Sequence, residues 1–225
     1  MEAIDSFLDR DVDPLVRGWI HTPSDARGDG LILTHGAGGN CAAPLLVALA
    51  ETFCGHGYTV LRCDLPFRQN KAFGPPFPGN AERDRAGLRN AVLAMRKIVD
   101  VKREGAKVFL GGHSYGGRQA TNLCADELEL VSGLLLLSYP LHPPRKPEQL
   151  RTQHLPNLLT PTLFVHGTRD PFGSIEEMQK TLLLIPARNE LLEVDGAGHD
   201  LGFKGKVQAS SLPAQVFARF DEMFG

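Results

Sequence analysis

The chain has 225 residues, of which 42% are hydrophobic and 22% are charged. This composition is typical of a folded protein and excludes a disordered chain, and the length suits one α/β domain over residues 1–225. The 24 basic and 26 acidic side chains leave a formal net charge of −2, which gives no support to nucleic acid as a partner.

Short apolar runs alternate with longer segments of helical periodicity along the chain. This alternation is typical of βαβ units and predicts a mostly parallel sheet of about seven strands with helices on both faces. The predicted strands are 16–20, 31–34, 59–63, 107–110, 134–138, 162–165 and 191–194. Several of them are apolar without alternation, as expected for strands that are covered on both faces.

The clearest predicted helix covers about 81–103, where apolar side chains recur at intervals of three and four residues. Ser174 and Glu177 match a capping box that opens a helix through Leu184, and a last helix presents Val216 and Phe220 on one face. The segments 64–80 and 141–161 are rich in proline and are predicted to be loops at the rim of the sheet. Both are too short for a large helical lid.

The sequence predicts a cytoplasmic protein that does not enter a membrane. Its first residues are acidic with no apolar core of a signal peptide, and no apolar run approaches the ~20 residues of a membrane span. The four cysteines lack metal-binding spacing and are interpreted as buried thiols of a reducing compartment.

The strongest chemical signal is the pentapeptide Gly112-His113-Ser114-Tyr115-Gly116, which matches G-x-S-x-G. An apolar strand precedes it and a helical segment follows it, as a nucleophile elbow requires. Ser114 is therefore predicted to be a nucleophile at the apex of a strained turn. A phosphate-binding loop starting at Gly111 is excluded, because Gly117 stands where that motif needs lysine.

A glycine-rich segment, His35-Gly36-Ala37-Gly38-Gly39, follows the predicted strand 31–34. A loop at this place commonly supplies one backbone N–H to an oxyanion hole, and the residue after the nucleophile supplies another. Ala37 and Tyr115 are the predicted donors. The alternative is a glycine-rich turn without a catalytic role.

A nucleophilic serine needs a base, and the base needs a carboxylate to orient it. Asp170 lies just after the predicted strand 162–165, and His199 lies in a short glycine-rich loop after the last strand. The order serine, aspartate, histidine is the one typical of this architecture. Asp195 and Asp200 are too close to His199 in sequence to orient its ring easily.

Five further side chains are candidates for contact with substrate because they lie near these motifs: His35, Phe67, Arg68, Tyr139 and Phe172. Phe67, Tyr139 and Phe172 are expected to form apolar walls, and Arg68 has the alternative reading of a solvated loop residue. No pattern of metal ligands is present, and the predicted chemistry needs no cofactor.

Taken together, the loop 35–39, the elbow 112–118, the segment 64–68, the loop 166–173 and the end Gly198-His199 resemble one family. It is the small α/β-hydrolase family, related to dienelactone hydrolases, that includes testis-expressed protein 30 and the hydrolase-like domain of the KAT8 regulatory NSL complex subunit 3. The resemblance covers nearly the whole chain and implies an α/β-hydrolase fold with little or no lid. It implies no substrate. Dienelactone hydrolases use a cysteine nucleophile where this chain has Ser114.

The sequence therefore predicts a serine hydrolase that acts on a small acyl ester through Ser114, His199 and Asp170. Two alternatives stay open: a non-hydrolytic, perhydrolase-like enzyme on the same triad, and a protein-interaction module with a vestigial triad. The expected partner is a small-molecule ester. The oligomeric state stays open, with a homo-oligomer as one option.

Overall fold

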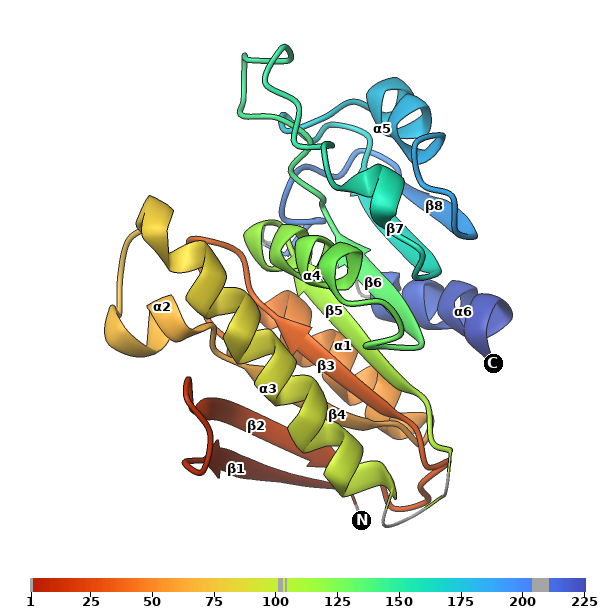
Figure 1. Ribbon diagram of the computed structural model, residues 1–225. Helices are drawn as coiled ribbons and strands as arrows, with labels where there is room; N and C mark the ends of the chain where they lie inside the picture. Colours follow the sequence, from red (N-terminus) through yellow and green to blue (C-terminus); the bar gives the residue numbers. More distant parts are fainter. Residues whose placement is uncertain (1, 101–102, 104, 204–210) are drawn as a thin grey trace.

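The computed structural model describes residues 2–100, 103, 105–203 and 211–225. Its described residues form one sheet of eight strands in the order β1-β2-β4-β3-β5-β6-β7-β8 (Figure 1). The strands are β1 (Ala3–Asp9), β2 (Val16–Thr22), β3 (Gly30–Thr34), β4 (Thr59–Cys63), β5 (Val108–His113), β6 (Gly133–Leu137), β7 (Thr162–Gly167) and β8 (Asn189–Val194).

The pairing confirms the predicted mostly parallel sheet. β1 pairs antiparallel with β2, and β2 pairs antiparallel with β4, whereas every other neighbouring pair is parallel. The sheet has eight strands where about seven are predicted, and the additional one is β1. β1 is an edge strand whose side chains are mostly exposed, so its sequence lacks the buried apolar pattern that identifies the central strands.

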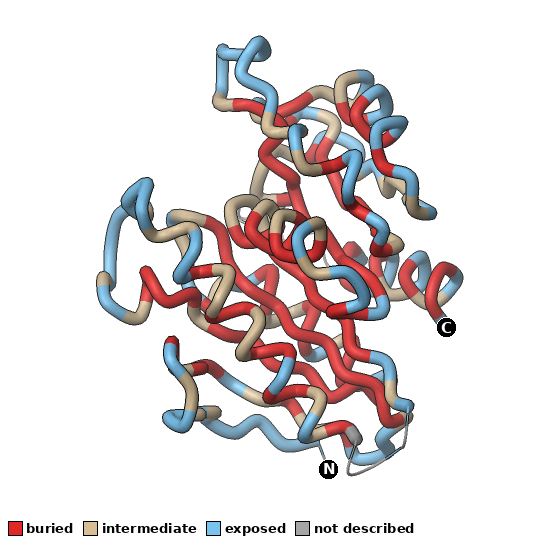
Figure 2. The backbone as a smooth tube through the Cα atoms, viewed as in Figure 1, coloured by how far each residue is buried: buried red, intermediate tan, exposed pale blue. Residues whose placement is uncertain are grey.

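Helices cover both faces of the sheet (Figure 1). α1 (Pro44–Gly55) and α6 (Leu212–Phe224) share an apolar cluster with one face, and α3 (Ala81–Asp100), α4 (Tyr115–Asp126) and α5 (Ile175–Leu182) share a second cluster with the other. Successive residues of β3 alternate between the two, since Leu31 and Leu33 belong to the first and Ile32 to the second. The central strands are therefore buried on both sides (Figure 2).

The two proline-rich segments contain only short helices: α2 (Pro66–Asn70) and the 3₁₀ turns η1 (Pro78–Asn80) and η2 (Leu155–Asn157). The capping box before α5 is present, since Glu177 N–H donates to Ser174 Oγ at 3.2 Å and Ser174 N–H donates to Glu177 Oε2 at 2.8 Å. α5 ends at Leu182, two residues before the predicted end. Residues 101 and 102 of the predicted helix 81–103 lie outside the described residues.

All four cysteines lie within the described residues and are buried: Cys41, Cys54, Cys63 and Cys124. None of them forms a disulfide. Burial raises the pKa of Cys41 and of Cys124 to about 12. Among the described helices, none is long and apolar enough to cross a membrane.

Candidate active site

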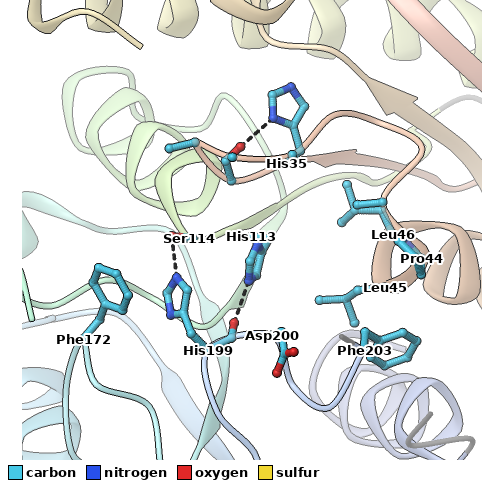
Figure 3. Close-up of a pocket in the computed structure, with 15 residues that line it drawn as sticks. His35, Pro44, Leu45, Leu46, His113, Ser114, Phe172, His199, Asp200 and Phe203 are labelled. Atoms are coloured by element: carbon cyan, nitrogen blue, oxygen red, sulfur yellow. Dashed lines mark hydrogen bonds between the residues drawn. The ribbon is translucent and has the colours of Figure 1, made fainter. Parts of the chain in front are cut away.

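Four parallel strands end at the same edge of the sheet, and the loop after each carries a predicted site residue. Ala37 follows β3, Ser114 follows β5, Asp170 follows β7 and His199 follows β8. Ser114 Oγ lies 2.8 Å from His199 Nε2 (Figure 3), and His199 Nδ1 lies 2.8 Å from Asp170 Oδ2. Side chains that are 85 and 29 residues apart in sequence thus form one hydrogen-bonded chain.

Ser114 occupies a strained turn between β5 and α4. Its φ of 50° and ψ of −115° place a non-glycine residue at positive φ, which the surrounding structure must enforce. The Ser114 N–H is held by the Leu137 carbonyl at 2.8 Å. A Cβ at Gly116 would come within 2.6 Å of the His35 carbonyl, so glycine there lets the elbow approach the loop after β3.

Asp170 is buried and accepts two hydrogen bonds. Its Oδ1 accepts from Phe172 N–H at 2.9 Å, and its Oδ2 accepts from Nδ1–H of His199 at 2.8 Å. Since the proton of His199 then lies on Nδ1, the lone pair of Nε2 faces the Ser114 hydroxyl. Beneath Asp170, the buried His166 donates from Nε2 to the Gly173 carbonyl at 2.9 Å, and burial lowers the pKa of His166.

Two other side chains hold His199. The Phe172 ring lies against the His199 ring with 4.1 Å between centroids and 30° between planes. His113 donates from Nε2 to the His199 carbonyl at 2.8 Å (Figure 3). The imidazole is therefore fixed through its ring, its backbone and its bond to Asp170.

The side chain of His35 holds the loop 35–39 in place. His35 is buried and donates from Nδ1 to the Gly36 carbonyl at 2.8 Å, while its Nε2 accepts from Leu65 N–H at 3.1 Å. These roles need a neutral ring, and burial lowers the pKa of His35. The ring lies on the side of the loop away from the cavity (Figure 3). Because the C=O and N–H of a trans peptide point in opposite directions, the Ala37 N–H is turned toward the cavity.

Tyr115 is the first residue of α4, where a backbone N–H has no partner within the helix. Its phenol donates to Asp84 Oδ2 at 2.8 Å, and Asp84 Oδ1 accepts from Phe67 N–H at 2.9 Å. Asp84 is fully buried in the first turn of α3, and burial raises its pKa. This carboxyl group therefore links α3 to both α2 and α4.

A cavity of about 290 Å³ opens beside Ser114. Its walls are mostly apolar and come from the loop 35–39, the start of α1 and the loop after β8 (Figure 3). The lining residues are His35, Gly36, Ala37, Gly38, Gly39, Ala43, Pro44, Leu45, Leu46, His113, Ser114, Phe172, His199, Asp200 and Phe203.

The structure does not bring three of the predicted substrate contacts to this cavity. Phe67 is buried with its ring against His35 and Tyr115, and Tyr139 is buried with its hydroxyl donating to the Arg151 carbonyl at 2.8 Å. Arg68 is also buried and donates to backbone carbonyls. These placements correct the expectation that the three line the pocket. Of the five candidates, only His35 and Phe172 line it.

Other lining residues were not predicted from the sequence. Leu45 and Leu46 belong to an apolar stretch that gave no sign of facing a cavity, although it begins a few residues after the loop 35–39. Phe203 follows His199 closely in sequence, and this proximity is the one signal that could have identified it. In the described parts of the chain, no group of three or more His, Cys, Asp or Glu residues could hold a metal ion.

Several solved structures share this fold at low sequence identity. The dienelactone hydrolase from Anabaena variabilis is 20% identical, with a TM-score of 0.73 over 100% of this chain and 99% of that one. An alpha-beta serine hydrolase homologue from Coxiella burnetii is 20% identical, with a TM-score of 0.72 over 96% of each chain. An esterase from Pyrococcus furiosus is 17% identical, with a TM-score of 0.73 over 100% of this chain and 92% of that one.

The family model for the alpha/beta hydrolase domain matches residues 27–218. This span includes β3 to β8 and all the residues of the candidate active site. The chain therefore belongs to the alpha/beta hydrolase domain family.

Proposed function

We propose that the protein is a serine hydrolase that cleaves carboxylic esters with compact, uncharged acyl groups. One observation carries this proposal: Ser114, at positive φ, has its Oγ 2.8 Å from the Nε2 of a histidine whose Nδ1 is 2.8 Å from a buried aspartate. The motifs of the chain further support a place in the branch that includes testis-expressed protein 30.

In the acylation step, Ser114 Oγ attacks the ester carbonyl carbon while its proton moves to His199 Nε2. Asp170 keeps the other ring proton on Nδ1 and stabilises the imidazolium that forms. The negative charge on the former carbonyl oxygen is stabilised by the N–H groups of Ala37 and Tyr115. The tetrahedral intermediate collapses as the C–O bond to the alcohol breaks and His199 gives its proton to the leaving oxygen.

In the deacylation step, His199 takes a proton from a water molecule that attacks the acyl carbon. The second tetrahedral intermediate collapses, the bond to Ser114 Oγ breaks, and His199 returns the proton to the serine. The products are a carboxylic acid and the free hydroxyl of Ser114. No cofactor enters either step.

The cavity supports the choice of substrate. At about 290 Å³ it lies at the lower end of the range for small-molecule sites, and the described residues that line it include no lysine or arginine. Leu45, Leu46 and Phe203 provide an apolar wall. Each methylene that is buried adds about 0.8 kcal/mol of binding, and a chain that outgrows the cavity gains nothing further. Along a series of p-nitrophenyl esters, kcat/KM is expected to be highest from acetyl to butyryl and to fall beyond.

The direct test is labelling with a fluorophosphonate probe, which reacts with an activated serine. Wild-type protein should be labelled at Ser114 and should hydrolyse p-nitrophenyl acetate, whereas Ser114→Ala should do neither. Ser138→Ala is the matched control, because Ser138 also has a φ of 50° and directly follows the neighbouring strand β6, where it is buried.

Wild-type protein that takes up no probe and turns over no ester would overturn the proposal and favour an interaction module. A steady rise of kcat/KM up to dodecanoyl esters would overturn only the compact acyl group.

A further inference from the structure

Arg68 is a buried cation that donates hydrogen bonds to backbone carbonyl groups. It lies in α2 and is 5% exposed, and its guanidinium donates to four carbonyl oxygens. Nε donates to Gly39 at 2.7 Å and Nη2 donates to Ala37 at 2.7 Å. Nη1 donates to Lys71 at 2.9 Å, and Nη2 also donates to Gly74 at 3.0 Å. The side chain thus joins the loop 35–39 to the segment 71–74.

Two peptide bonds flank Ala37 in the loop 35–39, and the carbonyl of each accepts a hydrogen bond from a buried side chain. The peptide before Ala37 is held by His35 through the Gly36 carbonyl, and the peptide after Ala37 is held by Arg68 through the Ala37 carbonyl. Both planes next to Ala37 are therefore fixed from the side away from the substrate. Residues 36–39 are all glycine or alanine, so their own side chains offer almost no packing that could fix these two peptide planes.

Arg68 is itself held in place by its neighbours. The N–H of Phe67 is bound by the buried Asp84, which also binds the phenol of Tyr115. The guanidinium lies 4.9 Å from the centroid of the Phe67 ring. One short helix is thus connected to Ala37 through Arg68 and to Tyr115 through Asp84.

We propose that Arg68 is a positioning residue that keeps the loop 35–39 in the shape needed to receive the oxyanion. This inference rests on the proposed function, because it assigns a role in stabilising the transition state of ester cleavage. The planar guanidinium satisfies carbonyls on two loops at once, and an ammonium group cannot span them in the same geometry. Loss of the guanidinium lets the Ala37 peptide rotate away from the reacting carbonyl.

The test compares Arg68→Lys and Arg68→Gln with Arg62→Lys. Arg62 is the matched control because it is also 5% exposed and also donates to a loop carbonyl, that of Cys41. It donates from Nε to His21 as well, and neither of these hydrogen bonds goes to residues 35–39. For each variant that melts cooperatively, the measurements are kcat and KM on p-nitrophenyl acetate and the Ki of a small alkyl boronic acid. The boronate adduct of Ser114 places an oxygen where the oxyanion forms.

An oxyanion donor acts mainly in the transition state, so its displacement lowers kcat and leaves KM nearly unchanged. Arg68→Lys and Arg68→Gln should lower kcat about 10- to 100-fold and raise the boronic acid Ki in parallel, with KM within about threefold of wild type. Arg62→Lys should retain kcat within about threefold, although both positions lose a buried guanidinium.

Equal losses of kcat at Arg62 and Arg68 would overturn the inference, and so would a change in KM alone. The fluorophosphonate endpoint separates this result from a failure of the proposed function. If Ser114 of every folded variant is still labelled to completion, the nucleophile is intact and only the role of Arg68 is in question. If wild-type Ser114 is not labelled, the proposed function itself fails.

Discussion

The two halves of the site are built in opposite ways. In the half around Ser114, the contacts that matter join side chain to side chain, from Ser114 through His199 to Asp170. In the half around Ala37, the expected donors are backbone N–H groups, and side chains hold the backbone from behind. The first half is defined by residue identity and the second by peptide orientation.

This difference predicts different sensitivities to mutation. A substitution in the serine half removes a chemical group that nothing else supplies. A substitution in the oxyanion half leaves every donor in place and changes only its direction. We therefore expect large losses of activity in the first half and graded losses in the second.

The largest effect is expected for Asp170→Asn. An amide in this position favours the wrong tautomer of His199, so kcat should fall by roughly 10⁴-fold. Steady-state kinetics on p-nitrophenyl acetate measures this loss. Asp195→Asn is the control, because Asp195 is exposed and accepts a hydrogen bond from Thr168 Oγ1 at 3.4 Å, away from His199 in the hydrogen-bonded chain. A comparable loss in the control would show that Asp170 is not the carboxylate that specifically orients His199.

An intermediate effect is expected for Gly36→Ala, at the junction of the two halves. The added Cβ would lie 3.0 Å from His113 Nδ1 and 3.2 Å from Ser114 Cβ, so the loop or these neighbours must move apart by a few tenths of an ångström. We expect kcat/KM to fall about 10- to 100-fold, as for a displaced oxyanion donor. Gly38→Ala is the control in the same loop, because its Cβ would meet nothing within 4 Å. Full activity in Gly36→Ala would contradict a close approach of Gly36 to His113 and Ser114.

A smaller effect is expected for Phe172→Ala. The ring packs against His199, and such contacts contribute about 0.5–1.5 kcal/mol, which corresponds to a loss of kcat of about 2- to 12-fold. The Phe172 N–H that binds Asp170 is retained in the variant. Kinetics on short esters and a thermal melt separate the loss of His199 packing from a loss of stability. A loss of activity near that of Asp170→Asn would show that the ring does more than pack.

The smallest effect concerns stability rather than turnover. Burial raises the pKa of Asp84 above its value in the unfolded chain, so the folded state binds more protons in the window above pH 3.8. The contribution of Asp84 to stability is therefore present at low pH and lost as pH rises through the folded-state pKa. Relative to Asp84→Asn, wild type should lose stability as pH rises from 4 to 8, and urea unfolding of both proteins over this range measures the difference. Parallel pH profiles would contradict the shift.

The sequence was most informative where chemistry and strand ends coincide. Ser114, Asp170 and His199 each follow an apolar strand, and parallel strands bring such positions to one edge of the sheet. The contacts of Phe67, Arg68 and Tyr139 could not be inferred in this way. The short helix α2 turns the first two inward, and Tyr139 points into the core after the positive φ of Ser138. Side-chain direction depends on such local turns, and sequence distance from a motif does not reveal it.

The same limit applies to elements. β1 was missed because its side chains are mostly exposed and leave no buried pattern. Leu45 and Leu46 belong to an apolar stretch of the sequence and are buried, yet they also form the cavity wall. From an apolar stretch in a sequence alone, side chains that pack in the core cannot be told from side chains that line a binding cavity.

The buried cysteines have a practical consequence for covalent chemistry at the site. Each native thiol is buried, and those of Cys41 and Cys124 have a pKa of about 12, so at neutral pH they are poor nucleophiles toward alkylating reagents. A Ser114→Cys substitution would place one new thiol at the cavity beside His199 against this silent background. A maleimide or haloacetamide tag would then report on access to a single position, without removal of any native cysteine.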